Sequence, residues 1–251
     1  PGMRAALTAA STRAGLQKIE LLAEPVAAAI AALRELPEVA AARTLGVYAL
    51  GGRSFSFSVL RRLEAANRAP LQPEWEVVAA RDERLLGSEA FDEAVVAHLI
   101  ESFHGSDGID LSSDNLAMHR LHEAAERAKS ELCSEGSSKI SLPFISADAS
   151  GPKHLELTLG RAKFEQLISS HLERTLPVCE GAISAAEMKS PSDLDAVLLV
   201  HGSARAPAVQ QLVRQLCGKE PLRLARPEES IALGAAAHAE TLQAAQYQTA
   251  A

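Results

Sequence analysis

Two strand-like segments constrain the fold of this chain more than any other feature. Residues 45–50 are mainly apolar, and a turn at 51–54 leads into residues 55–60, where Phe, Phe and Val alternate with Ser, Ser and Leu. An alternation of period two next to a glycine-containing turn predicts a β-hairpin. Residues 196–200 are apolar without a break, which is typical of a strand buried on both faces. A central sheet is therefore expected.

Helical patterns alternate with these strands along the chain. Further strands are expected at 75–79, 139–145, 154–159 and 222–224. Helices are expected within 1–40, where Glu24-Pro25 opens one, and at 88–103, 113–133, 161–186 with a kink at Pro177, 207–217 and from Pro227, with a frayed tail after Leu242. Strands that alternate with helices, together with hairpins, predict an α/β fold with a mixed sheet and an inserted α+β piece.

Composition excludes several classes of protein. Of the 251 residues 47% are hydrophobic, which excludes intrinsic disorder as the main state. No run of apolar residues is long enough to span a bilayer. Three widely spaced cysteines form no disulfide framework and fit a reducing compartment. A net charge of −7 argues against broad nucleic-acid or anionic-membrane binding and favours a protein partner.

Several catalytic signatures are absent from the sequence. The chain has neither the phosphate-binding pattern G-x-x-x-x-G-K-[ST] nor the nucleophile pattern G-x-S-x-G. His119 and His122 lie three residues apart on one expected helix, but no third ligand is near in sequence. A solvated helix face is favoured there over a metal site, and no metal is expected.

Three glycine-bearing turns form an ordered pattern along the chain. They lie at 51–54, 87–89 and 201–203, where each follows an apolar strand or opens a helix. Backbone N–H groups at such places can hold phosphate, although each turn alone is more often an ordinary one. With the segments 107–165 and 218–238, these turns make the chain resemble the ATPase domain of the seventy-kilodalton heat-shock chaperones. The sequence segments SGPKH and RAKFE are similar to those of the bacterial and mitochondrial branch of this family.

The resemblance implies an actin-like ATPase fold of which mainly the second lobe is present. It implies a helical remnant of the first lobe at 1–38, an inner subdomain at 39–86 and 161–226, an outer subdomain at 87–160, and a C-terminal helix with a frayed tail at 227–251. The first phosphate loop, the catalytic lysine and the peptide-binding domain of the family have no counterpart in the sequence. They were lost or lie outside it.

The resemblance also shows where the chemistry of the family has changed. The family's second phosphate loop, D-L-G-G-G-T-F-D, stands here as residues 49–56, so that Ala49 and Ser56 replace two acids. In the family these acids order a hydrated magnesium ion and the attacking water, a task that needs negative charge. Arg53 replaces a glycine and is expected to fill room meant for phosphate. The loop G-G-x-T-R begins here with His201, which adds bulk where a backbone would approach nucleotide.

Other nucleotide contacts survive in this comparison. The resemblance places Glu24 at the hinge, and Cys133 and Glu228 replace a serine and an aspartate of the adenosine clamp. Vestigial nucleotide contacts are expected at Gly51, Gly52, Ser54, Glu126, Lys129, Gly202 and Arg205. In the alternative interpretation, the first charged pair of the clamp, at 126 and 129, is a helix-surface ion pair, and the arginine serves packing alone.

Two functions compete on this sequence. The first is a catalytically inactive protein derived from a chaperone, which serves as a structural or interaction subunit of a larger, mitochondrial complex and binds neither nucleotide nor metal. The second is an ATP-binding folding chaperone or nucleotide-binding regulator that uses ATP or ADP with magnesium, as the family implies. The mitochondrial matrix is the expected location, with a bacterial cytoplasm or plastid stroma as alternatives. In a further hypothesis, the guanidinium of Arg53 binds a phosphate or a carboxylate next to the turn at 51–54.

Overall fold

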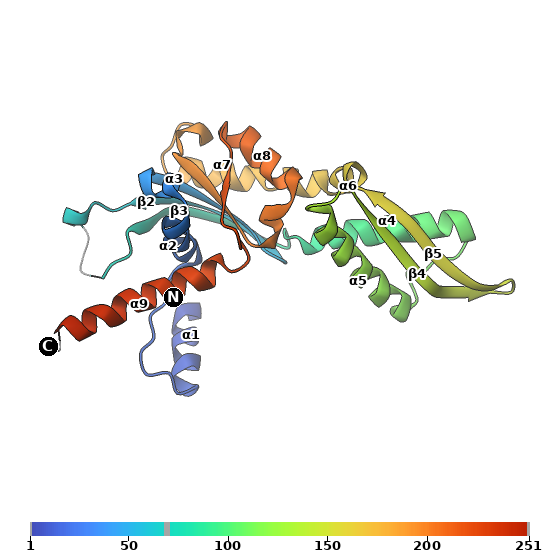
Figure 1. Ribbon diagram of the computed structural model, residues 1–251, viewed down its shortest axis with the longest axis horizontal. Helices are drawn as coiled ribbons and strands as arrows, with labels where there is room; N and C mark the ends of the chain where they lie inside the picture. Colours follow the sequence, from blue (N-terminus) through green and yellow to red (C-terminus); the bar gives the residue numbers. More distant parts are fainter. Residues whose placement is uncertain (1, 68–70, 250–251) are drawn as a thin grey trace.

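The computed structural model describes residues 2–67 and 71–249 of the chain. Figure 1 shows a twisted sheet with helices around it, and next to it a second body made of long helices and a hairpin. The sheet has five strands, in the order β3-β2-β1-β6-β7. These strands are β1 (Thr44–Leu50), β2 (Ser54–Arg62), β3 (Trp75–Arg84), β6 (Ala196–Val200) and β7 (Leu222–Arg223).

The pairing of the strands makes this a mixed sheet. Strand β1 pairs antiparallel with β2, which pairs antiparallel with β3, whereas β1 with β6 and β6 with β7 are parallel. The hairpin predicted from the 45–60 alternation is confirmed, and so is the α/β class with a mixed sheet flanked by helices. Separately, the strands β4 (Ser137–Asp148) and β5 (Gly151–Gly160) form an antiparallel two-stranded sheet.

Helices pack against both sheets (Figure 1). They are α1 (Gly2–Arg13), α2 (Glu24–Glu35), α3 (Pro37–Ala41), α4 (Glu89–Asp107), α5 (Asn115–Leu132), α6 (Arg161–Glu173), α7 (Leu176–Ala185), α8 (Pro207–Cys217) and α9 (Ser230–Thr249). Short 3₁₀ turns lie at Ala65–Asn67, Pro191–Asp193 and Gly202–Arg205. No helix within the described residues is long and apolar enough to cross a membrane.

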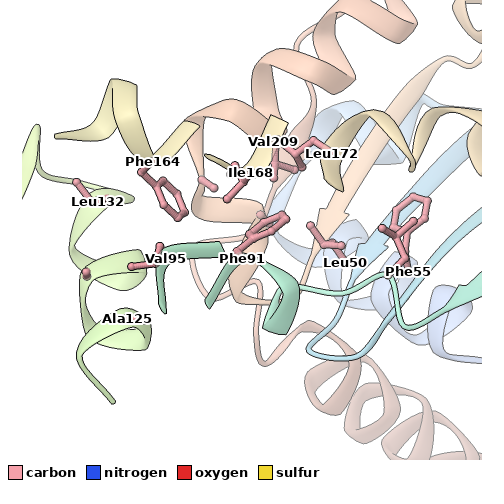
Figure 2. Close-up of a cluster of buried hydrophobic side chains, with 14 of the residues drawn as sticks. Leu50, Phe55, Phe91, Val95, Ala125, Leu132, Phe164, Ile168, Leu172 and Val209 are labelled. Atoms are coloured by element: carbon pink, nitrogen blue, oxygen red, sulfur yellow. The ribbon is translucent and has the colours of Figure 1, made fainter. Parts of the chain in front are cut away.

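Strand β1 feeds two separate apolar clusters because successive side chains of a strand point to opposite faces. Tyr48 and Leu50 join a cluster that includes helices α4 to α8, and Leu45 and Val47 join a cluster with α2 and α3. Figure 2 shows the first cluster running from the sheet to the helices of the second body, through the side chain of Phe91. This continuous core holds the two bodies together.

The second apolar cluster contains the one tryptophan of the chain, Trp75. Its side chain is buried at the start of β3, and its indole N–H has no hydrogen-bond partner among the described residues. Helices α2 and α9 meet next to this cluster at a close crossing. A Cβ on Gly234 of α9 would lie only 1.7 Å from the carbonyl oxygen of Ala27, so that only glycine fits there.

Three details of the expected elements are wrong. The expected helix 161–186 is two helices, since α6 ends at Glu173 and Pro177 starts a new helix, where its missing N–H costs nothing. Residues 16–23 are not helical, and the last helix begins at Ser230 rather than at Pro227. Helix α9 continues past Leu242 as far as Thr249, and the alanines and glutamines there are good helix formers. The expected fraying after Leu242 stays a prediction. Residues 250–251 lie outside the described residues.

The elements are distributed as the predicted division of the chain requires. All strands of the five-stranded sheet fall within 39–86 and 161–226, and α4, α5 and the β4–β5 hairpin fall within 87–160. The division into subdomains at these bounds stays a prediction.

Candidate functional site

A cleft of about 410 Å³ lies between the end of β1, the start of α4, helix α5 and the loop after β6. Its size is within the range of small-molecule sites. Six of the predicted nucleotide contacts line it, namely Gly51, Gly52, Glu126, Lys129, Gly202 and Arg205. His201, Cys133 and Glu228 line it as well. The structure does not bring Glu24, Ala49, Ser54 or Ser56 into this lining.

One wall of the cleft is the β1–β2 turn, which packs against the start of α4. The backbone N–H of Ser88 donates to the carbonyl oxygen of Gly51, and that of Glu89 to Gly52, both at 2.8 Å. A Cβ on Gly87 would lie 2.2 Å from the carbonyl oxygen of Gly52, so the two backbones touch. These carbonyls satisfy N–H groups at the start of α4 that a phosphate would otherwise use.

The positions of the two missing acids lie directly opposite each other in the sheet. Ala49 is the register partner of Ser56, and Ser56 is in turn the partner of Asp82 on β3. Register partners share one face of a sheet, so this row carries a methyl, a hydroxyl and one carboxylate at its outer strand. Magnesium in proteins is held through carboxylate oxygens. The residues at the two positions therefore do not fit a hydrated magnesium ion.

Arg53 does not enter the cleft, contrary to expectation. Its side chain is 75% exposed, and its Nε lies 3.5 Å from a carboxylate oxygen of Glu89. That acid is in the first turn of α4, where negative charge is favourable and attracts the guanidinium outward. The predicted obstruction of the phosphate room by Arg53 is wrong. The hypothesis that this guanidinium holds an anion in the cleft has no support in its position.

The side chain that lies next to the Gly51 turn in the cleft is that of His201. Its backbone has φ 70° and ψ 171°, a region that is almost restricted to glycine. The imidazole is half-buried, and its Cδ2 and Nε2 atoms lie 4.0 Å from where a Cβ of Gly51 would be. Burial lowers the pKa of His201, against the opposing charge of Glu24 at the start of α2. A mainly neutral ring therefore stands next to the turn that the resemblance assigns to phosphate.

The opposite wall is α5, whose lysine has a partner within the protein. Lys129 Nζ lies 2.6 Å from Asp92 Oδ2, and both side chains are largely buried. The alternative interpretation, a surface ion pair between Glu126 and Lys129, is wrong, because the lysine pairs with the acid on α4. Burial raises the pKa of Asp92, and the bond to Lys129 opposes that shift. The other oxygen of Asp92, Oδ1, is buried and has no hydrogen-bond partner within the described part of the chain.

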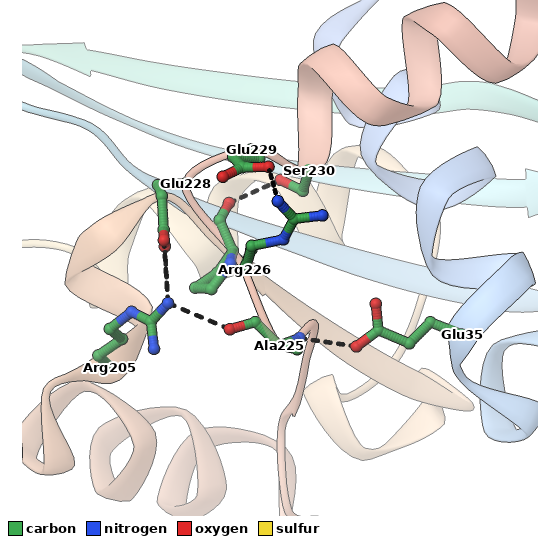
Figure 3. Close-up of polar contacts among 8 residues, drawn as sticks. Glu35, Arg205, Ala225, Arg226, Glu228, Glu229 and Ser230 are labelled. Carbon is green, nitrogen blue, oxygen red and sulfur yellow. Dashed lines mark hydrogen bonds and ion pairs between the residues drawn. The ribbon is translucent and has the colours of Figure 1, made fainter.

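Arg205 is likewise paired inside the chain (Figure 3). One of its nitrogens, Nη2, donates to both carboxylate oxygens of Glu228 at 2.9 and 3.1 Å and to the carbonyl oxygen of Ala225 at 3.1 Å. The bond from Arg205 holds the pKa of Glu228 below its ordinary value. The same backbone segment is fixed from the other side, since Ala225 N donates to Glu35 of α2 at 2.7 Å. Arg205 therefore makes a polar contact and does more than pack.

The remaining predicted groups have simple surroundings. The Cys133 thiol lies 3.4 Å from the carbonyl oxygen of Lys129, and burial raises its pKa, so that it stays neutral. His119 and His122 face two different carboxylates, and the described residues contain no group of three metal-binding side chains.

Some residues of the cleft were not expected from the sequence. Phe91 and Phe164 give it an apolar floor, and Asp92 neutralises its lysine. The sequence signal for Asp92 was its place near the start of the expected helix 88–103, five residues after Gly87. Its pairing with a lysine 37 residues away could not be deduced from spacing.

The family of the chain follows from this fold and site together with a family comparison. The model of the family described as Hsp70 protein matches residues 2–250, so the chain belongs to the Hsp70 family. The mixed sheet flanked by helices is accordingly the actin-like ATPase fold of that family. Members of this family are chaperones that bind ATP with magnesium.

Proposed function

We propose that this Hsp70-family protein does not hydrolyse ATP and that it serves as a structural or interaction subunit of a larger protein complex. The observation that carries the proposal is the row in which Ala49 lies opposite Ser56. Two positions at which the family places acids have no charge here. Charge stabilisation at the transferred phosphoryl group is the main source of catalysis in such enzymes.

The state of the cleft supports the same proposal. Its two cations, Lys129 and Arg205, are each engaged by an internal carboxylate. An anionic ligand would have to displace these carboxylates and would also meet the imidazole of His201. The apolar cluster next to the cleft nevertheless contains buried residues from β1, β2 and helices α4 to α8, which fits a fold that is retained for its interaction surface.

The wider setting of the protein belongs to the proposal as well. The similarity to the bacterial and mitochondrial branch supports a place in the mitochondrial matrix. We also propose the division into an inner subdomain at 39–86 and 161–226 and an outer one at 87–160.

A nucleotide-binding regulator is the second candidate function. The observation that favours it is the cleft itself, because it gathers six predicted contacts that are spread from Gly51 to Arg205 in the sequence. Such a regulator would bind ADP or ATP on the adenosine side and would not need catalysis.

Single-turnover hydrolysis of ATP with magnesium tests the proposal. We expect no hydrolysis above that of the Asp82→Asn variant, which removes the only carboxylate of the row formed by positions 49, 56 and 82. Hydrolysis at rates typical of the family, and lost in Asp82→Asn, would refute the inactive assignment.

Thermal unfolding with and without Mg-ADP separates the two candidates. A ligand at one hundred times its Kd stabilises a protein by about 2.7 kcal/mol, so a retained site gives a clear shift. No shift is expected for the wild type. A shift that disappears in Arg205→Ala would favour the regulator.

A further inference from the structure

The cations near the cleft offer little charge to a ligand, because each is paired within the chain. The pairs are Lys129 with Asp92, Arg205 with Glu228, and Arg53 with Glu89. Figure 3 shows the guanidinium of Arg205 turned to the carboxylate of Glu228. The fields of two opposite charges in close contact largely cancel for a third group. A phosphate would therefore meet no unpaired cation among the residues that line the cleft.

Two carboxylates near the cleft have no such partner. Glu126 lines the cleft from α5, and its side chain makes no ion pair or hydrogen bond with the part of the chain that the structure describes. Lys129, one turn later on α5, pairs with Asp92 instead. Glu24, at the start of α2, is likewise unpaired within residues 2–67 and 71–249 and acts through its charge on His201. The cleft is therefore negatively charged, the opposite of what a nucleotide needs.

The other groups of the cleft can accept hydrogen bonds or cover an apolar body. The imidazole of His201 is mainly neutral, because burial lowers its pKa, so that one ring nitrogen is an acceptor. Phe91 and Phe164 form the apolar floor, and Figure 2 shows both side chains in the cluster beneath the cleft. A ligand that covers this floor gains from the burial of apolar surface.

These features together select a small cation with an apolar part. We propose that the cleft binds an organic amine in its protonated form, with the ammonium group next to Glu126 and an aromatic or aliphatic body over Phe91 and Phe164. The cleft volume of about 410 Å³ suits a molecule of this kind. An apolar floor with a few polar groups that fix orientation is the usual composition of small-molecule sites.

The donor set favours an amine over a metal ion. A divalent cation needs several oxygen ligands that converge on one point. The described residues contain no group of three side chains that could hold a metal. One unpaired carboxylate beside an apolar floor instead matches a ligand that carries its charge at one end.

The inference rests on the proposed absence of ATP hydrolysis, because both follow from a cleft that no longer suits a nucleotide. Their tests are separate. The chain can fail to hydrolyse ATP and also fail to bind amines, and it can bind amines although it hydrolyses ATP.

Calorimetric titration of the whole chain with tryptamine tests the proposal. Tryptamine combines an ammonium group with an indole ring, and phenethylamine and hexylamine vary the apolar body. Tryptophol has the same indole ring with a neutral hydroxyl group, and indole-3-propionate has it with a carboxylate. We expect saturable binding of tryptamine that weakens as salt is added, since salt screens the attraction. Tryptophol should bind at least tenfold more weakly, and indole-3-propionate should give no heat of binding.

A matched pair of variants on α5 locates the site. Glu126→Gln keeps the shape of the side chain and removes its charge, and the affinity for tryptamine should fall at least tenfold. Glu123 lies three residues earlier on the same helix, where its carboxylate is 3.4 Å from Nε2 of His119, outside the lining of the cleft. Glu123→Gln should bind tryptamine within twofold of the wild type. Both variants should keep the melting temperature of the wild type, because both side chains are exposed.

Four results would overturn the proposal. They are no binding of any of the three amines, equal affinity for tryptamine and tryptophol, unchanged affinity for tryptamine in Glu126→Gln, and equal losses in Glu126→Gln and Glu123→Gln. The last result would mean that amines gather on an acidic surface without a site.

Discussion

Replacing His201 by glycine should stabilise the protein although it removes a half-buried side chain. The backbone at this position has φ 70° and ψ 171°. A residue other than glycine in this region costs about 1–3 kcal/mol. Glycine avoids that cost but gains roughly 0.5–1 kcal/mol of chain entropy in the unfolded state, which opposes folding.

The Ala variant is the control that isolates the backbone contribution. Both His201→Gly and His201→Ala lose the imidazole, but only the alanine keeps a Cβ in the strained conformation. The glycine variant should therefore exceed the alanine variant by about 1 kcal/mol. For a chain of this size that difference is roughly 2–4 °C in melting temperature. Urea unfolding with linear extrapolation measures it directly.

The pH dependence gives a second measure of the same residue. Burial lowers the pKa of His201 from its ordinary value of 6.5, so the unfolded chain binds more protons below that pH. Stability from this group is present above pH 6.5 and is lost as the pH falls toward the lowered pKa. The loss between pH 7 and pH 5 should be smaller in both variants than in the wild type. A glycine variant less stable than the alanine variant would refute the strain argument, and an unchanged pH slope would refute the assignment to His201.

Two further predictions concern the walls of the cleft. In Gly87→Ala the new Cβ would lie 2.2 Å from the carbonyl oxygen of Gly52, and we expect a loss of about 3 kcal/mol in the free energy of unfolding. Gly105 lies in open space near the end of α4, and Gly105→Ala should gain roughly 0.5–1 kcal/mol. Equal effects of the two substitutions in urea unfolding would contradict the close contact. In Lys129→Met the carboxylate of Asp92 stays buried without its cation, and we expect a loss of about 3 kcal/mol that Asp92→Leu in the same chain largely restores. If the double variant is no more stable than Lys129→Met in calorimetry, the pairing argument is wrong.

The sheet could be predicted from the sequence because its signals are local. Strand β1 is mainly apolar, its hairpin partner β2 begins with a period-two alternation, and the apolar run of β6 is unbroken. The break between α6 and α7 was underestimated, because Pro177 was expected to bend a helix and instead begins one. The last helix was predicted three residues too early, because a proline such as Pro227 is common at the first position of a helix, whereas α9 begins at Ser230.

The composition of the cleft could be predicted better than its contacts. Six of seven expected residues line it, because motif positions determine which backbone segments meet. The directions of Arg53 and Lys129 depend on acids of another helix, Glu89 and Asp92, and such pairs are not encoded in local spacing. The left-handed backbone of Phe144 was not expected either, because no local sequence pattern requires it.

The buried Trp75 makes it possible to follow the unfolding of one part of this molecule by fluorescence. It is the only tryptophan of the chain and it lies within the apolar cluster of the five-stranded sheet. Indole fluorescence therefore reports on that sheet alone, whereas far-ultraviolet circular dichroism also records the long helices α4 and α5. Coincident transitions by the two signals would mean that the continuous core makes the sheet and the second body one cooperative unit. An earlier dichroism transition would mean that the second body can open while the sheet stays folded.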